Sequence, residues 1–248
     1  MIHIYLFNEG TRSAVYVLGT YISQLKECIC NNRLFSLTII ELSSDKSDFV
    51  IYGLDGFKEI YIPIGKVHFP NKPVYYRNAW YLLKPHISHA PHDQIIFHLN
   101  YYQQFPLLSL MKRDFPECKT LFTIHYQSWC FGLNGNLSQL RRIIQCNSSV
   151  FGDENEKEIY DSFLEERNLY EVVDFVICLA EYTQNILTAL YNIPIHKIQL
   201  IYNGIKDEYT ELTEYHKEKL KSRLHFRKDE TIFLFVGRLD PIKGLDIL

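Results

Sequence analysis

Short apolar runs and longer stretches with a helical spacing of apolar residues alternate along most of the chain. Residues 2–7 form a short apolar run that ends at the turn-forming sequence Asn8-Glu9-Gly10. Residues 13–29 carry apolar side chains along one face, which is typical of an amphipathic helix, and residues 35–42 form a second apolar, β-branched run. A strand, a glycine-containing loop, a helix and a further strand, in this order, make the repeating unit of a doubly wound parallel sheet.

The same alternation continues to Gly204. The further strands are predicted at residues 58–63, 94–99, 119–124, 174–179 and 197–202. The further helices are predicted at residues 74–83, 106–115, 137–146, 153–171 and 182–191. Because these strands are apolar on both faces and alternate with helices, we expect an α/β, Rossmann-like fold, with a mostly parallel sheet and helices on both faces.

The pattern changes after Gly204. Residues 206–228 are polar and charged, which predicts a linker and an exposed helix, whereas residues 231–236 predict a buried strand. A loop and the first turn of a helix at residues 245–248 follow. Since one strand and one turn cannot bury a core, we expect residues 1–204 to form one domain and residues 205–248 to be a linker with the incomplete start of a truncated second domain.

Composition excludes several classes of protein. With 47% hydrophobic residues the chain can bury a core, and its net charge of −3 gives no basic surface for nucleic acid. Six cysteines occur without a C-x-x-C pair or zinc-ligand spacing, which favours buried, reduced thiols and no metal. No apolar run approaches the ~20 residues of a membrane span, and the N-terminus does not resemble a signal peptide. We expect a cytoplasmic protein, with recruitment to the inner face of the membrane as the alternative.

The most informative motif is Phe-Val-Gly-Arg-Leu-Asp-Pro-Ile-Lys-Gly at residues 235–244. The predicted strand ends at Gly237, where backbone can approach a ligand closely. Arg238 and Lys243 follow on a short loop that opens a helix. An arginine can bind phosphate oxygens with two N–H groups, a lysine adds a point charge, and a helix N-terminus donates amides, so this arrangement predicts a diphosphate site. Two solvated surface charges are the alternative.

This motif resembles the signature of family GT4, the retaining, nucleotide-sugar-dependent glycosyltransferases with the two-domain GT-B fold. The resemblance implies that the motif begins the donor-binding domain. It also implies that Arg238 and Lys243 hold the donor diphosphate, with Gly237 beside them. Both cations would then stabilise the negative charge that develops on the leaving diphosphate, which makes them catalytic residues and needs no metal.

Two further segments resemble the same family. They are residues 173–180 and residues 198–205, which are separated by a helix. Together they are similar to the last unit of the family's acceptor-side domain and the start of its hinge. Ala180 stands where the family usually has serine, and Lys206 where aspartate is common. A hydroxyl or a carboxylate near the cleft is therefore missing from this chain.

Polar residues at strand ends are the candidates for the other side of the cleft. A lone histidine such as His125, at the end of a strand, is more often structural than catalytic. The carboxyl edge of a parallel sheet is, however, where ligands bind in open α/β folds. The resemblance implies that His125 is catalytic and contacts the transferred sugar. It also implies that His98 and Asn100, in the neighbouring segment Ile-Phe-His-Leu-Asn, bind the acceptor.

Two loops leave alternatives open. Gly10 lies where the family has a glycine-rich loop facing the donor diphosphate, but a plain tight turn fits the sequence equally well. An aromatic loop contains Tyr126, Trp129 and Phe131. We expect Trp129 to bind the acceptor by stacking on a sugar ring, and the alternative is that these rings cover the core.

The resemblance implies an enzyme that transfers a sugar from a nucleotide diphosphate sugar to an acceptor hydroxyl with retention of configuration. The nucleotide sugar is the donor substrate, the acceptor is a glycan, a lipid-linked molecule or a peptide, and no cofactor is needed. The family's E-x7-E motif, which contacts the donor sugar, lies far downstream of the Gly-Arg segment, and we expect these 248 residues to end before it. We therefore expect the chain alone to turn over no nucleotide sugar.

Other functions fit parts of the sequence. Another GT-B enzyme, such as a sugar-nucleotide 2-epimerase, would share these motifs, and a non-catalytic binding or assembly module would share the fold. A Rossmann dehydrogenase is disfavoured, because the first loop lacks G-x-G-x-x-G. Finally, the strand predicted at residues 231–236 has no predicted partner strand in the chain. We expect it to be disordered or to form a homodimer by strand exchange, joined to the rest by the polar linker.

Overall fold

The computed structural model of the chain describes residues 1–10, 18–54, 56–64, 72–87, 90–145, 151–204 and 210–237. The chain divides into two units, residues 1–203 and residues 204–248, each of which is described by itself.

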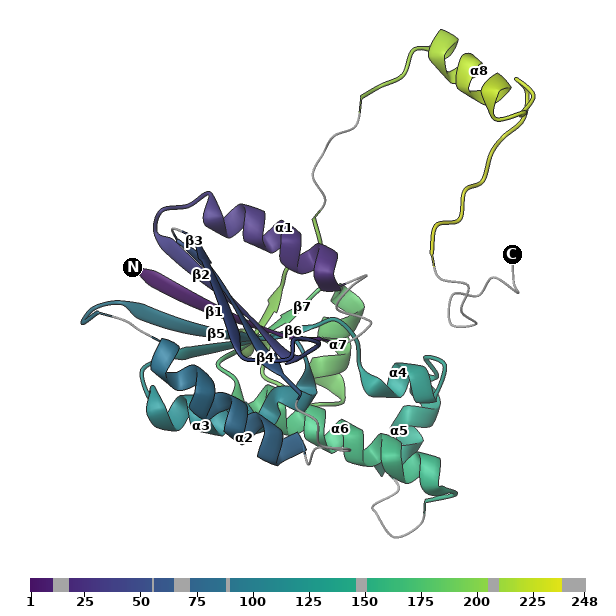
Figure 1. Cartoon of the computed structure of the whole chain (residues 1–248). Coiled ribbons are helices and arrows are strands. Elements are labelled where there is room, and N and C mark those ends of the chain that lie inside the picture. Colours follow the sequence, from purple (N-terminus) through teal and green to yellow (C-terminus); the bar gives the residue numbers. More distant parts are fainter. Residues whose placement is uncertain are drawn as a thin grey trace. The chain divides into compact units, whose positions relative to one another are not determined.

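The first unit is built on a single eight-stranded sheet, with the strand order β3-β4-β2-β1-β5-β6-β7-β8 (Figure 1). All neighbouring strands are parallel except β3, which runs antiparallel to β4 at the edge of the sheet. The strands are β1 (Ile2–Glu9), β2 (Phe35–Ser44), β3 (Val50–Leu54), β4 (Phe57–Pro63), β5 (Gln94–Leu99), β6 (Lys119–Ile124), β7 (Phe175–Cys178) and β8 (Ile198–Leu200).

Helices cover both faces of this sheet, as the alternating pattern predicts. In Figure 1, α1 lies on one face, and α2, α3 and α6 lie on the other. The helices of this unit are α1 (Gly19–Cys30), α2 (Lys72–Leu83), α3 (Phe105–Asp114), α4 (Ser128–Gly132), α5 (Leu137–Gln145), α6 (Glu154–Val172) and α7 (Glu181–Ala189). Single 3₁₀ turns are η2 (Lys84–His86), η3 (Tyr102–Gln104) and η4 (Ile195–Lys197). None of the helices in the described ranges is long and apolar enough to cross a membrane.

Alternation along β1 divides the core between the two faces. Tyr5 and Phe7 point to one face and pack against Phe97 of β5, in a large cluster to which α2, α3, α6 and α7 contribute. Leu6 points to the opposite face. It belongs to a smaller cluster with Ile22 of α1 and with Leu18, which directly precedes that helix. Burial on both faces explains why the central strands are continuous apolar runs.

Two departures from the predicted elements concern strands. β3 was not predicted, because its short sequence contains a glycine and gains its strand geometry only by pairing with β4. The strand predicted at residues 231–236 is wrong: this segment adopts no strand, and Phe233 and Leu234 are 93% and 83% exposed. A strand requires a neighbour for its backbone hydrogen bonds, and the described part of the second unit contains none.

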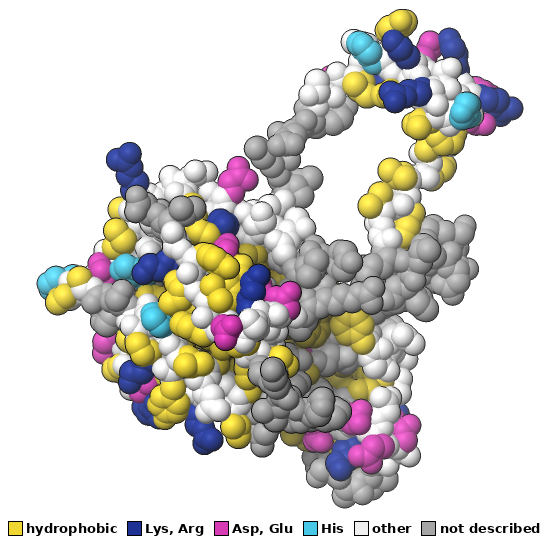
Figure 2. Space-filling model, in the orientation of Figure 1, with side chains coloured by type: hydrophobic (Ala, Val, Ile, Leu, Met, Phe, Trp, Pro, Cys, Tyr) yellow, Lys and Arg dark blue, Asp and Glu magenta, His cyan; other side chains and the backbone are white. Residues whose placement is uncertain are grey.

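The described part of the second unit contains one helix, α8 (Glu214–Arg223), which confirms the exposed helix predicted after Gly204. Thr213 caps its N-terminus, since its hydroxyl accepts a hydrogen bond from the backbone N–H of His216. Charged side chains surround this helix, whereas the segment that follows it exposes apolar ones (Figure 2).

Candidate functional site

Three neighbouring strands bring polar side chains to one edge of the sheet. β1, β5 and β6 are adjacent and parallel, so their carboxyl ends meet at the same edge. Glu9 is the last residue of β1, Asn100 directly follows β5, and His125 directly follows β6. In open α/β sheets ligands bind along this edge.

His125 is held by two neighbours. Its Nε2 atom lies 3.0 Å from Oδ1 of Asn100, and its ring packs edge-to-face against Tyr21 of α1, with ring centres 4.7 Å apart. Burial lowers the pKa of His125 to about 4, because the imidazolium form would lose its hydration. At neutral pH the side chain is therefore an uncharged imidazole, with one donor and one acceptor nitrogen.

Asn100 is fully engaged by hydrogen bonds inside the protein. Its Nδ2 donates to the backbone oxygen of Phe7 at 2.9 Å, while its Oδ1 faces His125. Its backbone N–H donates to Oε1 of Gln104 at 3.2 Å. The side chain thus links the ends of β1, β5 and β6.

A buried carboxylate, that of Glu9, supports this arrangement. Its Oε1 accepts hydrogen bonds from Nε2 of Gln104 at 3.2 Å and from the hydroxyl of Tyr76, on α2, at 3.0 Å. Burial and the neighbouring Glu9 raise the pKa of Tyr76. In the sequence Glu9 belongs to a turn-forming segment, and its place as a carboxylate at the end of an apolar strand is the signal that points to the site. Gln104 and Tyr76 gave no signal, because they lie far from Glu9 along the chain.

His98 lies within β5 rather than beyond its end. Its Nε2 and the hydroxyl oxygen of Thr123, on β6, are hydrogen-bonded at 2.7 Å. Burial, together with the nearby His125, lowers the pKa of His98 to about 4. The side chain therefore packs between the strands as a neutral imidazole.

The three residues predicted to bind the acceptor are all buried, and their contact with an acceptor stays a prediction. His98, Asn100 and Trp129 are 5%, 2% and 2% exposed. Trp129, on α4, belongs to the large core cluster, as the alternative of core cover implied. In the same aromatic loop Phe131 is exposed, and its ring packs against that of Tyr126, with ring centres 5.8 Å apart. Only local patterns were available in the sequence, and they do not reveal which aromatic rings the helices cover.

A glycine is required at position 10, because the backbone at the end of β1 lies very close to the backbone of β2 there. Its N–H donates to the backbone oxygen of Leu42 at 2.7 Å, and a Cβ atom at this position would lie 2.5 Å from the backbone oxygen of Ser43. A side chain here would displace the end of β2. The close packing explains why this residue is a glycine, and its contact with a diphosphate stays a prediction.

The predicted diphosphate site of the second unit falls largely outside the described residues. Arg238 and Lys243 both lie there, whereas Gly237 is described and exposed. Ala180 is described as well. It occupies the N-cap position of α7, where it provides no side-chain hydrogen bond.

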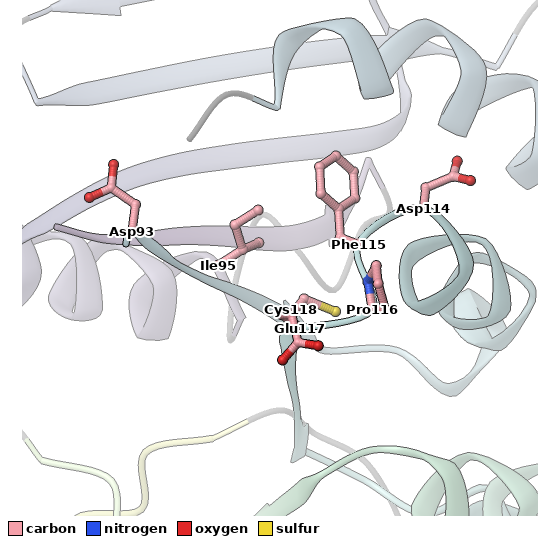
Figure 3. A pocket seen from close by; sticks show the side chains of 7 residues that line it. All are labelled: Asp93, Ile95, Asp114, Phe115, Pro116, Glu117 and Cys118. Atoms are coloured by element: carbon pink, nitrogen blue, oxygen red, sulfur yellow. The ribbon is translucent and has the colours of Figure 1, made fainter. Parts of the chain in front are cut away.

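A cavity of about 200 Å³ lies at the opposite edge of the sheet, near the amino ends of β5 and β6 (Figure 3). Two of its lining carboxylates are already paired. Asp93 accepts from the N-terminal amine at 2.6 Å, and Asp114 accepts from Nε1 of Trp80 at 2.9 Å. Within the described ranges, no group of three or more His, Cys, Asp or Glu side chains is placed to hold a metal ion. The carboxyl edge is therefore the candidate site.

Comparison with known proteins gives one match to a sequence family. The sequence model of Glycosyltransferase Family 4 matches residues 36–209. No match was found among curated proteins.

Solved structures give matches at low identity. Sucrose-phosphate synthase from Thermosynechococcus elongatus is 16% identical with a TM-score of 0.65, and the match covers 97% of this chain and 57% of the synthase. Trehalose-6-phosphate synthase from E. coli, bound with UDP-2-fluoro glucose, is 10% identical with a TM-score of 0.50, covering 90% and 54%. At these identities the likeness concerns the fold, and the chain spans little more than half the length of either protein.

Proposed function

Since the chain belongs to glycosyltransferase family 4, we propose that the protein transfers a sugar from a nucleotide diphosphate sugar to an acceptor hydroxyl, with retention of configuration. The family match, which extends over residues 36–209, is the observation that carries this proposal. The Rossmann-like α/β sheet of the GT-B glycosyltransferases supports it.

The two units take different parts in this proposal. Residues 1–204 are the acceptor-side domain, and residues 205–248 contain the linker and the first segment of the donor domain. The polar linker and exposed α8 between the large sheet and the Gly-Arg motif support this division.

The donor diphosphate is bound by Arg238 and Lys243, with Gly237 and Gly10 allowing backbone to approach it. Cleavage of the sugar–phosphate bond leaves negative charge on the diphosphate, and two fixed cations stabilise that charge without a metal or another cofactor. The motif spacing supports this assignment, and the E. coli structure bound with UDP-2-fluoro glucose supports a nucleotide sugar as donor.

His125 orients the transferred sugar at the carboxyl edge of the sheet. A neutral imidazole can exchange hydrogen bonds with sugar hydroxyls without attracting the anionic diphosphate away from Arg238 and Lys243. The lowered pKa and the half-buried position of His125 support this role.

Because we expect these 248 residues alone to turn over no nucleotide sugar, the test is a turnover assay of a form that includes a complete donor domain. The donors are UDP-glucose, ADP-glucose and GDP-mannose, each with and without a panel of sugar, lipid-linked and peptide acceptors. We expect acceptor-dependent release of the nucleoside diphosphate and an α-linked product from an α-linked donor. An inverted linkage would overturn retention. A product consisting of the epimerised nucleotide sugar, formed without acceptor, would instead establish an epimerase.

A further inference from the structure

We propose that Asn100 is a positioning residue that fixes the tautomer of His125, so that the imidazole carries its proton on Nε2 and offers Nδ1 as a hydrogen-bond acceptor. The tautomer follows from contacts within the protein. Its use, the acceptance of a hydrogen bond from a sugar hydroxyl, rests on the proposed function.

The first step is the orientation of the Asn100 amide. The backbone oxygen of Phe7 can only accept, so the amide atom 2.9 Å from it is Nδ2. The other amide atom, 3.0 Å from Nε2 of His125, is therefore the oxygen Oδ1. Because this oxygen also can only accept, Nε2 of His125 must carry the proton.

The second step is the rigidity of Asn100. The residue is buried, and Oε1 of Gln104 receives its backbone N–H at 3.2 Å. Gln104 is itself buried, and its Nε2 is bonded to the carboxylate of Glu9. Turning the amide over would leave the oxygen of Phe7 facing another oxygen in a buried setting, which is strongly unfavourable. The proton therefore stays on Nε2.

The third step is the charge state of His125. In the described part of the chain, the titratable groups that face it are His98 on β5 and Tyr21 on α1. The pKa of His98 is lowered to about 4 by burial, and burial raises the pKa of Tyr21 above its usual value. Neither group is charged at neutral pH, so nothing there stabilises an imidazolium. His125 is neutral, and its Nδ1 carries the acceptor lone pair.

The experiment is ¹⁵N spectroscopy of the full chain labelled with ¹⁵N-histidine, in which His125 is assigned by comparison with His125→Gln. At pH 7 we expect His125 to show a protonated Nε2 and an unprotonated Nδ1. In Asn100→Asp the carboxylate should stabilise the imidazolium and raise the pKa of His125 by about one to three units. The matched control, Thr123→Val, should alter the signals of His98 and leave the tautomer of His125 unchanged.

A protonated Nδ1, or a mixture of the two tautomers, in the unaltered chain would overturn the proposal even if Asn100→Asp does not fold. So would a folded Asn100→Asp variant in which His125 titrates as before. These spectra need no nucleotide sugar. The role of His125 in the proposed function is tested separately, in a form that includes a complete donor domain. If His125→Gln binds UDP-glucose there as tightly as the unaltered form, that role fails, and the positioning by Asn100 stands on the spectra.

Discussion

Glu166 of α6 accepts a hydrogen bond from the backbone N–H of Ser128 at 2.7 Å, three residues after His125. The contact fastens the segment that follows β6 to the longest helix of the unit. The other carboxylate oxygen of Glu166 accepts from the hydroxyl of Tyr191 at 2.6 Å. One buried side chain thus connects α4, α6 and the end of α7, and so supports the backbone beside the candidate site.

This carboxylate predicts a pH dependence of stability. Burial raises the pKa of Glu166 above its ordinary value of 4.5, and the hydrogen bonds from Ser128 and Tyr191 offset this in part. Between these two pKa values the folded protein holds a proton that the unfolded chain has released. The stabilisation is therefore complete below about pH 4.5 and is lost as pH rises through the raised pKa.

In Glu166→Gln we expect this part of the pH dependence to disappear, because the amide does not ionise. Its oxygen can accept from the N–H of Ser128 while its nitrogen donates to the hydroxyl oxygen of Tyr191. The measurement is the free energy of unfolding in urea, determined for Glu166→Gln and for the unaltered chain between pH 4 and 8. Glu158→Gln, which alters an exposed carboxylate on the same helix, is the matched control. Parallel stability curves for Glu166→Gln and the unaltered chain would contradict the prediction.

Gly10→Ala should destabilise the first unit. The new Cβ would lie 2.5 Å from the backbone oxygen of Ser43, so the ends of β1 and β2 must separate. We expect the free energy of unfolding to fall by about 1–3 kcal/mol. In the control, Gly53→Ala, the nearest atom would be Cγ of Lys58 at 3.9 Å, and the change should be much smaller. Equal effects of the two substitutions would show that the close approach is unimportant.

Ala180→Ser should stabilise α7. The residue occupies the N-cap with extended backbone, φ −153° and ψ 147°, yet provides no side-chain acceptor. A serine hydroxyl can accept from a free N–H of the first turn, and we expect a gain of about 0.5–1 kcal/mol in the free energy of unfolding. Ala189→Ser, at the other end of the helix, lacks this geometry and should not stabilise. Thermal or urea unfolding compares them, and no gain for Ala180→Ser would refute the capping argument.

Arg238→Ala and Lys243→Ala test the donor site in the transfer reaction of a form that includes a complete donor domain. Each removes a charge-assisted contact to the leaving diphosphate, and we expect a loss of about 2–4 kcal/mol of transition-state stabilisation, roughly 30- to 1000-fold in kcat/KM. Arg227→Ala serves as the control, because it removes a charge of the same unit that pairs with the carboxylates of Asp229 and Glu230 at the surface. If both site variants keep near-normal rates, the diphosphate-site assignment is wrong.

Local sequence was sufficient for most of the elements, because helices and buried strands have their own apolar periods. The predicted strands at residues 94–99 and 119–124 coincide with β5 and β6, and the predicted helix at 106–115 differs from α3 by one residue at each end. The ends of β5 and β6 are therefore readable from the sequence, and with them the positions of Asn100 and His125.

Two strands show where local sequence fails. Residues 50–54 are a weak strand sequence that becomes β3 by pairing with β4, and residues 231–236 are a strong one that forms no strand. In both cases the deciding factor is a neighbour that supplies or withholds backbone hydrogen bonds. The sequence of the segment itself does not contain that information.

Sequence and tertiary structure also determined different parts of the candidate site. The sequence by itself determined which polar residues end the strands, and its motifs indicated a glycosyltransferase. Only the tertiary structure decided that Asn100 faces inward to His125 and the oxygen of Phe7, that Gln104 joins it to Glu9, and that Trp129 belongs to the core. These contacts join residues some 25 to 95 positions apart. Burial and hydrogen-bond partners depend on which strands lie side by side, and the packing of the whole sheet determines that order.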